Sequence, residues 1–421
     1  MASRARAAAP ALSGEASSIA CDARRSHGDP ASENRLLHTD NKVGLEWLAR
    51  EGFAARFRCI YLDPPYNSGR KFKDYEDART PDAWRAMMRE RLALMRPLLA
   101  EDGAIFVEID DTELGTLQCL LDEAFGRENR VTTITVVRSA STGHKAQNKG
   151  PVNVADYLLV YASDKRMWRG EPQWRVRAHY DFAYGTYVQN ADAHPTAWTF
   201  EPLAKRALGA LGYRTMREAT RALGREQALR EVARFAMANH EGVVRFAQPR
   251  YEAVSREARA WIDRSRREPD VVHVFKRPGW KPMCLRGGNR ILRLSDKVRV
   301  HDGRAVLVEP LTNVWDDVPF QGIAREGGVV FPRSKKPERL LERVLAMSTR
   351  PGDWVLDPFL GSGTTAAVAH KMGRRWVGIE EGAHLETLAL PRLRRVVDGT
   401  DATGITRAHG HAGGGGFAVY A

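Results

Sequence analysis

The residues best suited to chemistry stand together as Asp63-Pro64-Pro65-Tyr66, directly after the short apolar run Cys59–Leu62. The Asp63 carboxylate and the Pro64 carbonyl can both accept hydrogen bonds from an NH2 group. Two successive prolines with fixed φ angles hold that carbonyl in one direction, and the Tyr66 ring offers a surface on which a base can stack. These four residues are therefore candidate catalytic residues for a flat base that carries an exocyclic amine. Taken alone, they also fit a strand that ends in a proline turn with Asp63 as its cap.

A second constellation lies near the carboxyl end of the chain. Asp357 ends an apolar run and is followed by Gly361-x-Gly363-x-x-Ala366, and Glu380 follows the next apolar run. This arrangement is typical of a nucleotide-cofactor site, in which glycines let the backbone approach the ligand and an acid takes ribose hydroxyls. Considered alone, it also fits a dinucleotide oxidoreductase. Asp357 favours another ligand, because an acid before the glycine turn can meet a positively charged amino-acid group, and no second phosphate-binding motif is present.

The elements that must position these residues alternate between strands and helices, which predicts an α/β fold. Short apolar runs at 59–62, 354–357 and 376–379 predict buried parallel strands. In an α/β sheet, ligands bind beyond the carboxyl ends of such strands, which is where both constellations stand. A helix is predicted to begin at Thr80-Pro81-Asp82, because a hydroxyl cap, a first-turn proline and a first-turn acid favour a helix start.

The alternation stops between residues 165 and 323, where the sequence is aromatic and basic, and residues 202–267 predict a largely helical segment. Basic residues interleaved with aromatic ones are typical of a nucleic-acid surface, although a solvated helical subdomain also shows them. The expected organisation is a disordered tail at 1–34, the two parts of one α/β domain at 35–164 and 324–400, an insert at 165–323, and a C-terminal tail or last strand at 401–421.

The composition favours a partner that carries phosphate. The chain has 421 residues, a formal net charge of +13 and an isoelectric point near 9.7, which favours nucleic acid unless an arginine-rich proteome explains the charge. No apolar run approaches the length of a membrane span, and the N-terminus lacks the apolar core of a secretion signal, so we expect a cytoplasmic protein without membrane contact. The cysteines are far apart and indicate neither a metal site nor a disulfide framework: Cys21, Cys59, Cys119 and Cys284.

Together, the two constellations resemble those of the β-class DNA amino-methyltransferases, and most closely the modification subunits of type III restriction-modification systems. The motifs Asp63–Tyr66 and Asp357–Thr365 carry this resemblance, and it covers both flanks of the chain but not residues 165–310. The chain is short for such a subunit. Shorter stretches that support the resemblance are Asp40-Asn41, Leu98 to Gly103, Asp110 to Leu114, Tyr157 to Tyr161, Lys336-Pro337-Glu338 and the glycine run before Phe417.

The resemblance implies a Rossmann-like fold with a final antiparallel strand and an inserted, largely helical target-recognition domain. It implies S-adenosyl-L-methionine as the methyl donor and double-stranded DNA as the substrate. It also raises a homodimer and a restriction subunit with nuclease or translocase activity as partners. The cofactor-binding residues assigned in this way are Asp357, Phe359, Gly361, Gly363, Thr364, Glu380, Lys336, Pro337, Asp40 and Asn41.

The implied reaction is methyl transfer to the N6 amine of adenine after base flipping, in a restriction-modification or epigenetic system. Hydrogen bonds from the amine to Asp63 and to the Pro64 carbonyl would localise the nitrogen lone pair, and the chemistry uses no metal. N4-cytosine methylation stays open because cytosine presents a similar amine; the acid at position 63 favours adenine by resemblance. A catalytically silent DNA-recognition subunit is the alternative outside enzymes, although such a module has no need of the glycine pocket.

Overall fold

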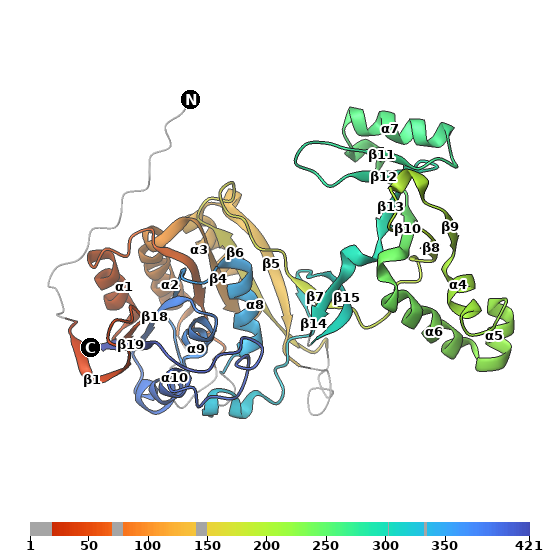
Figure 1. Cartoon of the computed structure of the whole chain (residues 1–421). Coiled ribbons are helices and arrows are strands. Elements are labelled where there is room, and N and C mark those ends of the chain that lie inside the picture. The colour runs from red at the N-terminus through yellow and green to blue at the C-terminus, as the bar shows by residue number, and fades with distance from the viewer. Residues whose placement is uncertain (1–18, 70–78, 140–149, 302, 332–334) are drawn as a thin grey trace. The chain divides into compact units, whose positions relative to one another are not determined.

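The computed structural model describes residues 19–69, 79–139, 150–301, 303–331 and 335–421. The chain forms two compact units. The first comprises residues up to Gln173 together with Leu311–Ala421, and the second, Trp174–Pro310, is an insertion in its sequence (Figure 1). Within the described ranges, no helix is both long and apolar enough to cross a membrane.

The first unit is built on a sheet of ten strands. They are β1 (Cys21–Gly28), β2 (Arg35–His38), β3 (Phe57–Leu62), β4 (Leu99–Ile109), β5 (Arg130–Val137), β6 (Ala155–Ala162), β16 (Val314–Trp315), β17 (Trp354–Asp357), β18 (Arg375–Glu380) and β19 (Gly416–Tyr420). Their order is β1-β19-β2-β18-β17-β3-β4-β6-β5-β16. β17 pairs in parallel with β18 and β3, and β3 with β4, whereas β6 runs antiparallel to its neighbours β4 and β5. The expected α/β fold is confirmed. The expected final antiparallel strand is not the last strand of the chain, because β19 pairs in parallel with β2 and antiparallel only with the edge strand β1, whereas the antiparallel strand β6 precedes the insert.

Helices cover both faces of this sheet (Figure 1): α1 (Asn41–Arg50), α2 (Pro81–Met95), α3 (Leu114–Phe125), α8 (Glu338–Ser348), α9 (Thr364–Lys371) and α10 (Leu390–Val397). In β3, Cys59 and Tyr61 pack in one core with α8, α9 and α10, while Ile60 and Leu62 pack in a second core with α1, α2 and α3. Successive strand residues point to opposite faces, so a strand covered on both sides must be apolar throughout. This explains the unbroken apolar run before Asp63.

The expected disordered tail at 1–34 is wrong for its second half. Residues 1–18 lie outside the described residues, but β1 pairs antiparallel with β19, which in turn pairs in parallel with β2. Asn34 connects β19 with β18, because its side-chain amide donates to the Gly416 carbonyl at 3.0 Å and accepts from the Trp376 N–H at 2.9 Å. The strand β1 reads CDARRSHG, a polar and basic sequence that gives no apolar periodicity, because only its partner strand faces the core.

The second unit is mixed rather than largely helical, which corrects the expectation for the insert. Its strands are short: β7 (Trp174–Val176), β8 (Thr186–Val188), β9 (Phe200–Pro202), β10 (Val243–Ala247), β11 (His273–Phe275), β12 (Met283–Arg286), β13 (Asn289–Arg293), β14 (Val298–His301) and β15 (Arg304–Pro310). They form a six-stranded sheet, β11-β12-β13-β10-β8-β9, and a three-stranded sheet, β14-β15-β7. Four helices accompany them: α4 (Leu203–Gly209), α5 (Met216–Leu223), α6 (Arg225–Ala238) and α7 (Arg256–Arg267). Apart from β15, which has seven residues, these strands have three to five residues and carry too little alternation to be recognised from the sequence.

This unit is also narrower than the expected insert at 165–323. Val314 and Trp315, for example, form β16 and extend the sheet of the first unit by pairing in parallel with β5.

Candidate active site

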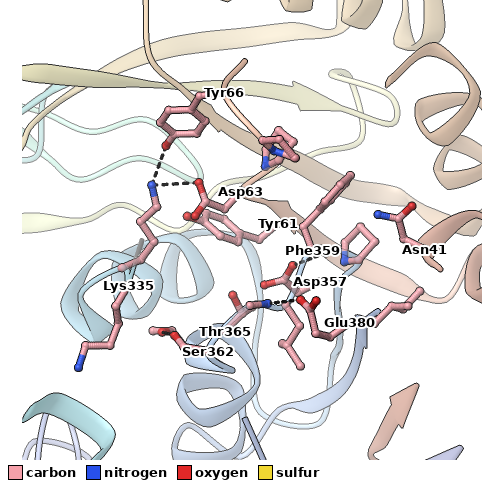
Figure 2. A pocket seen from close by; sticks show the side chains of 18 of the residues that line it. Asn41, Tyr61, Asp63, Tyr66, Lys335, Asp357, Phe359, Ser362, Thr365 and Glu380 are labelled. Atoms are coloured by element: carbon pink, nitrogen blue, oxygen red, sulfur yellow. Dashed lines mark hydrogen bonds and ion pairs between the residues drawn. The ribbon is translucent and has the colours of Figure 1, made fainter. Parts of the chain in front are cut away.

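The two constellations lie at the carboxyl ends of neighbouring strands. β17 and β3 pair in parallel with Leu356 opposite Ile60, so Asp357 at the end of one strand lies beside the Asp63 turn that follows the other. One pocket is lined by residues of both turns (Figure 2). The topology therefore brings together a possible amine acceptor and a glycine turn that are almost three hundred residues apart in the sequence.

The Asp63 turn is held in place by a tryptophan from α2. The start of α2 follows the prediction, because the Thr80 hydroxyl accepts a hydrogen bond from the Ala83 N–H and Pro81 occupies the first turn. This helix carries Trp84, which is 0% exposed, and its indole N–H donates to the Pro65 carbonyl at 2.7 Å. Among the contacts of the described residues, the Pro64 carbonyl receives no hydrogen bond and remains available to a ligand.

The acceptor side of the pocket is strongly charged. The Lys336 ammonium lies 2.9 Å from Asp63 Oδ1 and 3.0 Å from Glu108 Oε1, and it donates to the Tyr66 hydroxyl at 2.6 Å. Asp156, which is fully buried, lies 2.9 Å from Arg138. Figure 2 shows Asp63 and Tyr66 on this side of the pocket and joined by dashed lines to one amine nitrogen.

Burial and neighbouring charge shift the acidity of these groups. Burial, together with Glu108, raises the pKa of Asp63 to about 6, although Lys336 opposes the rise. The pKa of Asp156 is raised to about 7 by burial and by Glu108 and Asp63, against the effect of Lys336 and Arg138. Burial lowers the pKa of Lys336, but Asp63, Glu108 and Asp156 outweigh it, so the net pKa lies above the ordinary value. Near neutral pH the cluster therefore holds an ammonium and an Asp63 that is mostly ionised.

The donor side consists of Asp357, the glycine turn and Glu380. Asp357 is 3% exposed, and its Oδ1 accepts a hydrogen bond from the Phe359 N–H at 3.0 Å. Burial raises the pKa of Asp357 to about 7, against hydrogen bonds from Thr365 and Phe359. Glu380 closes the glycine turn by accepting from the Gly361 N–H at 2.7 Å. Its other oxygen accepts from the Gly382 N–H at 2.8 Å and lies 3.3 Å from the His384 ring, so Glu380 keeps about one of its four acceptor positions for a ligand hydroxyl.

The two glycines of the turn have different surroundings. Both adopt positive φ, +56° at Gly361 and +77° at Gly363, which a side chain would strain. Gly361 lines the pocket, whereas Gly363 caps α9 and faces away, with Ala389 only 3.4 Å from the position of an added Cβ. Gly361 therefore leaves open space on the pocket wall, whereas Gly363 allows close packing against Ala389.

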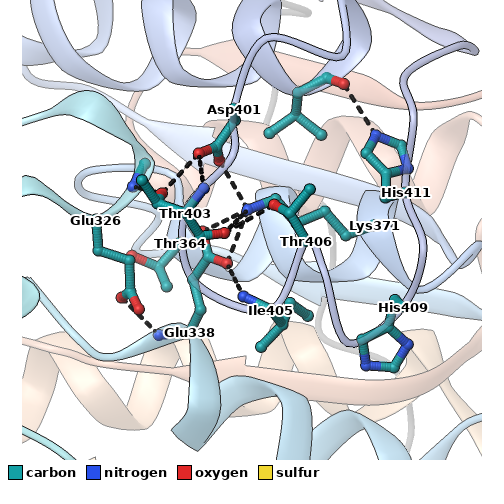
Figure 3. Close-up of polar contacts among 12 residues, drawn as sticks. Glu326, Glu338, Thr364, Lys371, Asp401, Thr403, Ile405, Thr406, His409 and His411 are labelled. Carbon is teal, nitrogen blue, oxygen red and sulfur yellow. Dashed lines mark hydrogen bonds and ion pairs between the residues drawn. The ribbon is translucent and has the colours of Figure 1, made fainter. Parts of the chain in front are cut away.

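A buried ionic network supports the glycine turn from behind (Figure 3). Lys371 lies 2.8 Å from Glu338 and 2.7 Å from Asp401, and all three side chains are at most 2% exposed. Arg392 connects this network to the turn, because it donates to Glu338 at 2.8 Å and to the Thr364 hydroxyl at 2.7 Å. The network thus holds Thr364, the first residue of α9, through Arg392 of α10.

The structure places most of the predicted residues on the pocket wall. Gly363 and Pro337 do not line it; Pro337 instead precedes α8 as its buried cap residue. Asp40 and Asn41 line it at the start of α1, where Asp40 accepts from the Lys42 N–H at 2.8 Å and both contact Arg91. The predicted residues that line the pocket are Asp63, Pro64, Pro65, Tyr66, Asp357, Phe359, Gly361, Thr364, Glu380, Lys336, Asp40 and Asn41.

Sequence reasoning missed two buried acids, Glu108 and Asp156, each 0% exposed. Each is the only acid in the core part of an apolar strand, VEI in β4 and ADYLLVYA in β6. A buried carboxylate is costly without a partner, so a lone acid inside such a strand signals a functional or paired site. It also missed Phe331 and His384, whose rings stack with 5.4 Å between centroids and which line the pocket beside Glu380.

Sequence comparison identifies the class of protein to which this fold and pocket belong. Residues 57–390 match the DNA methylase family, and the chain belongs to that family. The expected family is thereby confirmed. The chain is 29% identical, over 94% of its length, to a probable type III restriction-modification enzyme HindVI Mod subunit from Haemophilus influenzae, of which it covers 55%. It is 28% identical, over 86% of its length, to the type II methyltransferase M.EcaI from Enterobacter cloacae, of which it covers 69%. The chain therefore spans little more than half of the first relative.

Among solved structures, the chain is similar to that of the M1.HpyAVI–SAM complex. The two chains are 13% identical, the match covers 85% of this chain and 98% of the other, and the TM-score is 0.41.

Proposed function

We propose that the protein transfers a methyl group from S-adenosylmethionine to the N6 amine of adenine in double-stranded DNA. The observation that supports this most directly is the shared pocket of the two strand-end turns, with Asp63 and the open Pro64 carbonyl on one side and Asp357 and Glu380 on the other. An amine acceptor and a cofactor turn in one pocket suit a group transfer between two ligands. Membership of the DNA methylase family favours a methyl group as what is transferred.

The donor side fits S-adenosylmethionine in its charges. When bound, the cofactor supplies a methyl group on a positively charged sulfur. Asp357, buried and at the end of β17, would face the positive amino-acid part of the cofactor, and Glu380 would take its ribose hydroxyls. Gly361 lets the backbone approach the ligand without a side chain in the way. Phe331 and His384 line the same wall beside Glu380 and suit a flat purine ring.

On the acceptor side, Asp63 and Pro64 would act on the amine of a base that has flipped out of the helix. The N6 nitrogen is a poor nucleophile because its lone pair is delocalised into the ring. Hydrogen bonds from its two N–H groups to the Asp63 carboxylate and the Pro64 carbonyl would draw the nitrogen towards a tetrahedral geometry and localise that pair. Methylation leaves an extra proton on the nitrogen, and Asp63, with a pKa of about 6, is placed to accept it. Tyr66 would support the base by stacking.

The second unit would bind DNA, and its most exposed aromatic side chain marks the contact. The loop 276–282 joins β11 to β12, and in it Trp280 is 69% exposed. The Arg277 guanidinium lies 4.2 Å from the Trp280 ring centroid, and Lys276 and Lys281 flank the pair. A positively charged loop with an exposed ring suits phosphate attraction together with base stacking. A homodimer and a restriction subunit remain predictions for this chain, which covers only part of its Mod relative.

Two measurements test the proposed reaction. Calorimetry should show binding of S-adenosylmethionine that Glu380→Ala weakens, and no binding of nicotinamide dinucleotides. Label from the donor's methyl group should then appear in unmethylated DNA incubated with the wild-type protein. Binding of a nicotinamide dinucleotide with no binding of S-adenosylmethionine would replace this proposal with an oxidoreductase. Donor binding without transfer to DNA, RNA or nucleosides would instead reduce the protein to a recognition subunit.

A further inference from the structure

The side chain of Lys336 occupies a central place on the acceptor side of the pocket. Its ammonium has three oxygens within hydrogen-bond distance: Asp63 Oδ1 at 2.9 Å, Glu108 Oε1 at 3.0 Å and the Tyr66 hydroxyl at 2.6 Å. Two of these contacts are hydrogen bonds, to Glu108 and to Tyr66, whereas the contact with Asp63 is an ion pair. Lys336 therefore joins the start of α8 to the Asp63 turn and places its charge on the acceptor side of the pocket.

The surroundings explain why a cation is needed there. Three carboxylates from different strands face this point: Asp63 after β3, Glu108 on β4 and Asp156 on β6. Glu108 and Asp156 are fully buried, and Tyr61 donates its hydroxyl to Glu108. Buried carboxylates that share a site repel one another, and without a cation one of them takes up a proton. Lys336 lies beside Asp63 and Glu108, and it also lowers the pKa of Asp156, with a smaller contribution from Arg138 at 2.9 Å.

We propose that Lys336 is a positioning residue for methyl transfer: it keeps Asp63 ionised and fixes one carboxylate oxygen, so that the other oxygen faces the target amine. This inference rests on the proposed function. It moves Lys336 from the cofactor side, where the sequence resemblance had placed it, to the acceptor side. It also gives Glu108 an opposing role, because its negative charge beside Asp63 favours protonation of that carboxyl.

The charges that face Asp63 set the direction of the expected pH effect. They are Lys336 before α8, Glu108 on β4, Asp156 on β6 and Asp357 on β17, with the Tyr66 hydroxyl on its own turn. Of these, Lys336 is the cation that lowers the pKa of Asp63 from its burial-raised level. Loss of the cation should raise this pKa by about two units, within the range known for a charge at this distance. With the pKa moving from about 6 to roughly 8, the ionised fraction of Asp63 at pH 7 falls about tenfold.

The test compares Lys336→Met, which removes the charge at similar length, with Lys336→Arg, which keeps it. Lys165→Met is the matched control, because Lys165 is exposed and its ammonium donates only to the Arg130 carbonyl. In Lys336→Met, kcat at pH 7 should fall about tenfold, and the acid limb of the kcat–pH profile should move up by about two units. The dissociation constant of S-adenosylmethionine should change less than about twofold. Lys336→Arg should keep the limb near its wild-type position, and Glu108→Gln should move it downwards.

The pKa of Asp63 can also be followed without activity. The ¹³C resonance of its carboxyl, identified by its loss in Asp63→Asn, should titrate at higher pH in Lys336→Met than in the wild type. An unshifted titration and an unshifted acid limb would overturn the proposal. Donor binding weakened more than about tenfold, with an unshifted limb, would return Lys336 to the cofactor side. If the wild type transfers no methyl group while the resonance shifts as expected, the positioning contact stands and the proposed function fails.

Discussion

Lys371 is the side chain whose removal should destabilise the first unit most clearly. Its ammonium is 0% exposed and contacts both oxygens of Glu338, at 3.0 and 2.8 Å, and Asp401 at 2.7 Å. These contacts tie α9 to α8 and to the segment after α10 (Figure 3). The substitution Lys371→Met keeps the length of the side chain and removes only the charge and its hydrogen bonds.

The loss of unfolding free energy in Lys371→Met depends on which partners Glu338 and Asp401 keep. Glu338 would keep the Arg392 guanidinium at 2.8 Å and the Ile405 N–H at 3.1 Å, and Asp401 would keep the Thr403 N–H at 3.0 Å. Breaking a buried ion pair costs about 3–5 kcal/mol, and these remaining partners place Lys371→Met at the lower end, about 3 kcal/mol. Such a loss raises the ratio of unfolded to folded protein more than about a hundredfold.

Urea unfolding can be monitored by hydrogen exchange in peptides of α8 and α9, which report on the first unit separately from the insert. Lys371→Met should lower the unfolding midpoint there by about 1 M. Lys42→Met is the control, and it should change little because the Lys42–Glu90 pair is exposed. The double variant Glu338→Gln with Lys371→Met should be less destabilised than the sum of the single variants, because the two variants remove the same ion pair and the Glu338 charge that lost one of its two cations is gone. A loss below about 1 kcal/mol in Lys371→Met would refute the assignment of this network as a buried, mutually compensated cluster.

Three further outcomes follow from single contacts. The pKa of Asp357 is about 7, so donor affinity should rise about tenfold from pH 6 to pH 8 as this carboxyl ionises; calorimetry should find that rise in the wild type and a flat profile in Asp357→Asn, and a flat wild-type profile would exclude Asp357 as the partner of the donor's positive charge. Trp84→Phe leaves the partly buried Pro65 carbonyl without its donor and should cost about 1 kcal/mol in unfolding free energy together with a lower kcat; a variant with wild-type stability and rate would show that the indole does not hold the turn. Trp280→Ala should weaken DNA binding roughly 5- to 100-fold in fluorescence anisotropy with donor affinity unchanged, and unchanged DNA affinity would remove the loop 276–282 from the interface.

Much of the site could be predicted from the sequence because its chemistry lies in short, continuous motifs. Asp63 to Tyr66 and Asp357 to Glu380 each follow a buried strand whose apolar run is unmistakable, and the end of a parallel strand is where an α/β sheet binds ligands. The start of α2 was equally local, since Thr80 and Pro81 specify a helix start without any tertiary contact.

What could not be predicted depends on contacts between distant residues. The strand β1 is polar and exists because β19, from the other end of the chain, offers it an edge. The sequence predicts a largely helical insert because most of its strands are too short to show alternation. The sequence also predicts Lys336 as a pocket residue, but Glu108, an acid within an apolar strand, decides which side of the pocket its ammonium contacts.

Nucleoside mass spectrometry decides whether the pocket at Asp63 methylates adenine at N6. Unmethylated double-stranded DNA is incubated with S-adenosylmethionine and either the wild-type protein or Asp63→Ala, then digested to nucleosides. We expect N6-methyladenine with the wild type and none with Asp63→Ala, while calorimetry should show that the variant still binds the donor. N4-methylcytosine as the product, or N6-methyladenine formed equally well by Asp63→Ala, would contradict it.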